Sequence, residues 1–157
     1  MSSIAEAWIV RRDDLLALAE RAERQQWDSF WSSIRSRARP VLPEYNRFAG
    51  YVVAVVIAYL DEQGVITPMD TDREDVKRLA RVFPNLVACM GWHAAREYTS
   101  ALATVSQDAG ILRDFFEEFQ EEQWPEAGQA MAEGLDYLAG AAQQVESPEE
   151  YVMVSIG

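Results

Sequence analysis

Three side chains in one short stretch have the types and the spacing for chemistry. Cys89, His93 and Glu97 follow one another at intervals of four residues, which on a helix places them on one face. Thiolate, imidazole and carboxylate groups all ligate transition metals. A cysteine beside a histidine that a carboxylate orients also has the composition of a nucleophilic catalytic site. The stretch therefore raises the hypothesis of a small metal- or ligand-dependent enzyme.

The rest of the chain does not complete such a site. There is no second cysteine or histidine, and short motifs of this kind are often accidental. Cysteine is commonly buried as a small apolar residue, and a histidine beside Trp92 can form a hydrogen bond in the core. We therefore predict structural roles for Cys89 and His93, no catalytic residue, no metal and no cofactor.

A group of acidic side chains lies between Asp114 and Glu126. The spacing of Leu112 and the phenylalanines that follow it predicts an amphipathic helix over 109–123, with the acids on its opposite face. No lysine or arginine is interleaved among these acids to form the i, i+4 pairs of most surface helices. Like charges four residues apart cost a few tenths of a kcal/mol each, so this face indicates a docking surface for a basic partner. The predicted partner-binding residues, with Phe116 or Trp124 as the aromatic anchor, are Asp114, Phe116, Glu117, Glu118, Glu121, Glu122, Trp124 and Glu126.

The overall charge is strongly negative and unevenly distributed. The 157 residues include 26 acidic and 14 basic side chains and have a net charge of −12. Residues 1–96 hold 13 of each sign, whereas residues 97–157 hold 13 acids and one base. Nucleic-acid binding requires a clustered basic surface, so the composition argues against that class of partner.

Other features of the sequence indicate the cellular location of the protein and its number of domains. The first 30 residues contain six acidic side chains and lack the pattern of a secretory signal. The longest apolar run, residues 48–60, is shorter than the ~20 residues of a membrane span. A single cysteine excludes an internal disulfide. These features predict a cytoplasmic protein that does not enter membranes, folded as one acidic helical domain over residues 1–157.

Periodicity and helix-ending residues predict a mainly α bundle of about six helices. A helix is expected over 12–25, and a second begins near Trp27 and ends before Pro40. The remaining helical segments are expected over 45–62, 71–83, 86–105, 109–123 and 125–145, although Gly91 interrupts the 86–105 segment. The β-branched ending at 151–156 predicts a strand, and only residues 4–10 offer it a comparable partner. We therefore expect the two chain ends to form a small β-pair beside the bundle.

Three functional hypotheses follow from these patterns. The first is a protein that inhibits or sequesters a basic protein partner, and in size and charge the chain resembles bacterial immunity proteins, which neutralise toxin enzymes. The second is the enzyme that would use Cys89, His93 and Glu97. The third is a helical adaptor or oligomerisation module, whose five tryptophans would leave an apolar patch exposed.

Overall fold

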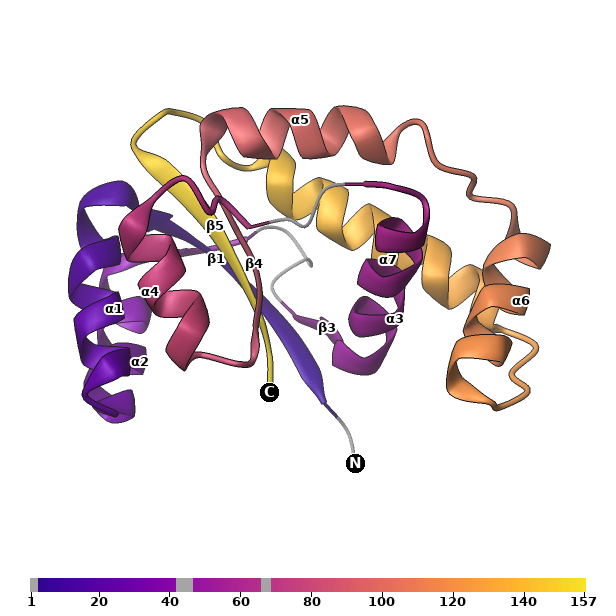
Figure 1. Ribbon diagram of the computed structural model, residues 1–157, viewed down its shortest axis with the longest axis horizontal. Coiled ribbons are helices and arrows are strands. Elements are labelled where there is room, and N and C mark those ends of the chain that lie inside the picture. The colour runs from indigo at the N-terminus through magenta and orange to yellow at the C-terminus, as the bar shows by residue number, and fades with distance from the viewer. Residues whose placement is uncertain (1–2, 42–46, 66–68) are drawn as a thin grey trace.

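The computed structural model describes residues 3–41, 47–65 and 69–157. Within these ranges the chain forms three layers, with an antiparallel sheet between two groups of helices (Figure 1). The sheet runs diagonally through the centre of the view. The mixed α/β arrangement corrects the prediction of a helical bundle, although helices still make up most of the structure.

The predicted pairing of the chain ends is confirmed, and it forms the centre of the sheet. Strand β1 (Ile4–Arg11) pairs with β5 (Glu150–Ile156) in antiparallel register from Ala5 opposite Ile156 to Arg11 opposite Glu150. Strand β4 (Leu86–Met90) pairs with the other edge of β5. Two short strands, β2 (Arg39–Pro40) and β3 (Arg47–Ala49), pair with β1 on its outer side.

Side chains alternate across the three long strands and fill two separate cores. In β5, Val152 and Val154 point into one core, and Tyr151 and Met153 point into the other. In β4, Met90 points into the first core and its neighbour Cys89 points into the second. This is expected because successive side chains of a strand face opposite sides of the sheet. Because both faces of the sheet are buried, its strands are nearly continuous apolar runs rather than alternating patterns.

Two groups of helices cover the sheet. One face is covered by α1 (Leu15–Glu23), which follows a short 3-10 turn at Arg12–Asp14, and by α2 (Trp27–Arg37) and α4 (Glu74–Val82). The other face is covered by α3 (Gly50–Glu62), α5 (Trp92–Leu102), α6 (Ala109–Gln120) and α7 (Ala127–Gln143). Figure 1 shows the first group on the left and the second on the right and above.

Three local predictions are wrong. Residues 86–90 form a strand instead of the start of a helix, because β5 offers this apolar run a hydrogen-bonding edge. Residues 47–49 pair with β1, so α3 begins at Gly50; the earlier part of that expected helix, residues 45–46, lies outside the described residues. The helix expected over 71–83 begins three residues later, at Glu74, and Arg73 is its N-cap.

The ends of α3 and α6 follow local sequence signals. After α3, Gly64 adopts a φ of 78°, its amide donates to Asp61 O, and the next amide, of Val65, donates to Leu60 O. This is the Schellman arrangement that favours glycine. At the start of α6, the Asp108 side chain accepts a hydrogen bond from the Ile111 amide. These contacts end α3 after Glu62 and begin α6 at Ala109.

Candidate functional site

Charge is distributed unequally between the two helical layers. Helices α1, α2 and α4 together carry six basic and five acidic side chains, whereas α3, α5, α6 and α7 carry two basic and eight acidic ones. The excess of acids that appears along the sequence as a C-terminal feature therefore lies on one side of the sheet. It includes α3, which belongs to the first half of the chain.

Ion pairs reinforce this difference. On the side of α1, α2 and α4, arginine side chains pair with acids, for example Arg37 with Asp14 at 2.9 Å and Arg73 with Asp75 at 2.6 Å. On α6, within the described part of the chain, one ion pair is found, between the exposed neighbours Arg113 and Asp114 at 3.2 Å. Among the described residues, the other acids of this helix and of the loop that follows it form no ion pair.

The predicted partner-binding residues divide into a surface set and a supporting set. Five acids are exposed: Asp114, Glu118, Glu121, Glu122 and Glu126. The Glu117 carboxylate accepts a hydrogen bond from the Trp124 amide at 3.2 Å. Trp124 is half-buried and packs on Phe116, their ring centroids 5.2 Å apart. Phe116 is only 3% exposed, so these two aromatic side chains hold the loop onto the helix from beneath.

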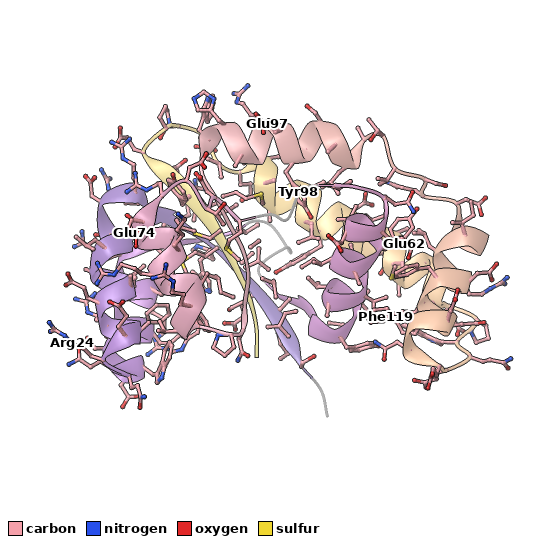
Figure 2. The ribbon with its side chains drawn as sticks, in the orientation of Figure 1. Arg24, Glu62, Glu74, Glu97, Tyr98 and Phe119 are labelled. Carbon is pink, nitrogen blue, oxygen red and sulfur yellow. The ribbon has the colours of Figure 1, made fainter. Side chains whose placement is uncertain are left out.

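The exposed aromatic residue of α6 is Phe119, which lies in a groove between α3 and α6. The groove has a volume of about 530 Å³ and is lined by Ala58, Asp61, Glu62, Phe115, Glu118 and Phe119. Phe119 stacks on Phe115 with centroids 5.8 Å apart, and its side chain is 54% exposed. Figure 2 shows Glu62 and Phe119 on the facing sides of α3 and α6.

Aromatic side chains form the bottom of the groove, and carboxylates surround its opening. Below it, Tyr59 of α3 meets Phe115 edge-on at 5.2 Å, and its hydroxyl donates to the Ser106 carbonyl at 3.0 Å. Burial, together with the negative charge of Glu62, raises the pKa of Tyr59. Three carboxylates around exposed aromatic faces suit a cationic group, because the ring faces and the carboxylates both attract positive charge.

The structure separates Cys89, His93 and Glu97. Cys89 lies in β4, is fully buried in the core beneath α1, α2 and α4, and burial raises the pKa of its thiol. His93 and Glu97 lie on α5 and are exposed. The expected alignment on one helix face is therefore wrong, since the helix begins only after Gly91. Among the described residues, no three His, Cys, Asp or Glu side chains are placed to hold a metal ion.

Sequence reasoning identified the acids of α6 but missed Asp61, Glu62 and Phe119 as groove residues. Asp61 and Glu62 are the last residues of an apolar helix that contains no basic side chain. These two acids were the signal in the sequence that could have identified them as site residues. Phe119 belongs to the apolar face that was expected to be covered. The five tryptophans, which the adaptor hypothesis places in an exposed patch, are all half-buried.

Comparison with protein-family models, with curated proteins and with solved structures finds no match. Within the residues described, none of the helices has the length and apolar character needed to cross a membrane.

Proposed function

We propose that the protein binds a basic protein partner through the groove between α3 and α6 and inhibits or sequesters it. The observation that carries the proposal is the exposed Phe119 among the carboxylates of Asp61, Glu62 and Glu118. An aromatic ring exposed among unneutralised acids supports a docking surface for a cationic group.

The groove has the features of a binding hot spot for an arginine or lysine side chain. Phe119 offers a ring face for the cation, and Glu62 and Glu118 offer carboxylate oxygens from two helices. The exposed acids Glu121 and Glu122 extend the negative field beyond the groove. A field of this kind speeds encounter with a positively charged partner up to ~10⁸–10⁹ M⁻¹s⁻¹ at low salt.

The kind of partner follows from the distribution of charge. An acidic surface that mimics phosphates fits the basic cleft of an enzyme acting on nucleic acids or nucleotides. Rapid capture of such an enzyme is the task of an immunity or antitoxin-like protein, and we assign this role to the chain. The enzyme and adaptor hypotheses lack comparable support, because Cys89 is buried while His93 is exposed, and the tryptophans are partly covered.

The test compares charge reversals on the two helical layers. Tagged wild-type protein captures partners from a lysate of the source organism at ~50 mM and ~500 mM salt, and the captured protein is purified for titration calorimetry. The groove variant combines Glu62→Lys with Glu118→Lys. We expect it to bind the purified partner at least about tenfold more weakly at low salt, because two contacts become repulsive.

The matched control combines Glu20→Lys with Glu74→Lys, which makes the same change in net charge on exposed positions of α1 and α4. It should bind nearly as tightly as the wild type. Equal losses in the two variants would reduce the effect to net charge alone and contradict a groove-specific site. An enzyme assay of the captured partner, with and without this protein, then tests inhibition.

A further inference from the structure

Arginine and lysine differ in the shape and hydration of the charged group that would enter the groove between α3 and α6. The arginine guanidinium is planar and weakly hydrated, and its N–H donors point outward in one plane. The lysine ammonium is a compact and strongly hydrated point charge. The walls of the groove can therefore favour one of these groups over the other.

The aromatic wall of the groove suits a planar cation. Phe119 and Phe115 lie nearly parallel, with an angle of 16° between their rings and 5.8 Å between the centroids. Phe119 is 54% exposed, so a flat group can lie against the part of its ring that Phe115 does not cover. A guanidinium group stacks on an aromatic face in this manner, whereas an ammonium group has no flat face and gains only the cation–π attraction.

The apolar bottom of the groove disfavours a strongly hydrated group. Ala58 and Phe115 line it beside Phe119, and Phe115 packs on the Tyr59 ring with centroids 5.2 Å apart. A cation that enters loses part of its water shell over these apolar atoms. That loss costs less free energy for a guanidinium than for an ammonium, because the guanidinium is the more weakly hydrated of the two.

Carboxylates lie on both of the helices that border the groove. Asp61 and Glu62 belong to α3, and Glu118 belongs to α6. All three are exposed, and no ion pair neutralises them within residues 3–41, 47–65 and 69–157. Figure 2 shows Glu62 on the side of α3 that faces Phe119. Because guanidinium donors point in several directions within one plane, one arginine can donate to carboxylates of both helices while its face lies on a ring.

We infer that the groove selects an arginine side chain of the basic partner over a lysine side chain. This inference rests on the proposed function and adds which residue determines the choice. The guanidinium stacks on Phe119, and its N–H groups donate to Glu62 and Glu118. The acids attract either cation, whereas the Phe119 ring makes the difference between them.

The test is an NMR titration of the ¹⁵N-labelled full chain at low salt with three matched probes. N-acetyl-arginine methylamide and N-acetyl-lysine methylamide carry the two cations, and N-acetyl-citrulline methylamide has nearly the shape of the arginine probe without its charge. We expect the arginine probe to shift the amides of Ala58, Glu62 and Phe119, with a dissociation constant on the order of 10 mM for a single side chain. The lysine probe should bind about fivefold more weakly, and the citrulline probe more weakly still. Sodium chloride titrated to the same ionic strength corrects for shifts caused by salt alone.

Two exposed apolar residues of α6 give a matched pair of variants. Phe119→Leu removes the ring but keeps an apolar side chain, so the arginine and lysine probes should bind this variant with nearly equal affinity. Ile111→Leu changes a position that is 52% exposed and lies outside the residues that line the groove, and it should keep the wild-type preference. The melting temperatures of both variants check that the fold is intact.

The proposed function is tested separately by Glu62→Gln combined with Glu118→Gln, which should weaken the binding of both cations. Equal affinity of the wild type for the arginine and lysine probes would overturn the inference and leave the proposed function standing. An arginine preference that survives in Phe119→Leu would also overturn it, since the ring would not determine the choice. Groove amides that neither cation shifts up to ~50 mM, about five times the expected dissociation constant, would contradict both the inference and the proposed function.

Discussion

Individual charged side chains on the α1, α2 and α4 side are held by specific partners, and Asp75 is the most enclosed of them. Its side chain is 10% exposed and accepts hydrogen bonds from Arg73 at 3.0 and 2.6 Å and from the Val76 amide at 2.9 Å. Burial by itself would raise the pKa of Asp75, but Arg73 and the amide bond lower it overall below its ordinary value. A carboxyl with a depressed folded-state pKa stabilises the fold above its unfolded-state pKa.

We predict that Asp75→Asn lowers the free energy of unfolding by ~1–2 kcal/mol at pH 7, because it leaves the Arg73 guanidinium without a charged partner. The stabilisation from Asp75 is lost as the pH falls through the folded-state pKa, so wild type and variant should converge in acid. Urea unfolding at pH 7 and at about pH 3 measures the difference. Asp13→Asn, at an exposed position, is the control. A gap that persists unchanged in acid would contradict this account.

Helices α6 and α7 approach each other closely at their N-terminal ends. Gly128, in the first turn of α7, lies against the backbone of Ala109 in α6; a Cβ atom at position 128 would be 2.1 Å from the Ala109 carbonyl oxygen. This contact fixes how closely α6 and α7 approach each other at these ends. By contrast, a Cβ atom at Gly110 would meet only the Asp108 side chain, at 3.2 Å.

We predict that Gly128→Ala lowers the free energy of unfolding by about 2–3 kcal/mol, because backbone must move to remove the overlap. Gly110→Ala should lie within about 0.5 kcal/mol of the wild type or be slightly more stable, since alanine favours a helix over glycine. Thermal and urea unfolding of the two variants make the comparison. Equal effects would mean that α6 and α7 are not in this close contact.

At the scale of the whole molecule, the two chain ends form the middle of the sheet. Strand β5 lies between β1 and β4 and contributes side chains to both cores, among them Val152, Val154 and Met153. The two helical layers therefore share one central strand that is the last segment of the chain. Their stabilities should be coupled, so the protein should unfold as one unit.

We predict that deletion of residues 150–157 abolishes cooperative folding, since it removes the central strand and opens both cores. Far-UV circular dichroism and urea unfolding check this outcome. Val154→Ala provides the milder comparison and should cost ~1–3 kcal/mol while leaving a folded protein. A truncated chain that still unfolds in a single sharp transition would show that the helical layers fold without β5.

The secondary structure was predictable wherever a local pattern was sufficient. The amphipathic spacing around Phe116 placed α6, and the β-branched residues near Val154 placed the terminal strand. The prediction failed at 86–90, because a buried strand and a buried helix segment have the same short apolar run. There, only the open edge of β5 selected the strand.

The candidate site shows the same division. The sequence alone determined that acids are in excess, that α6 carries many of them and that Cys89 is an apolar core residue. Only the tertiary structure decided that Glu62 meets Glu118 and Phe119 across a groove. Charge and periodicity are properties of neighbouring residues, whereas a binding site joins residues far apart in the chain, and their approach depends on how the helices pack.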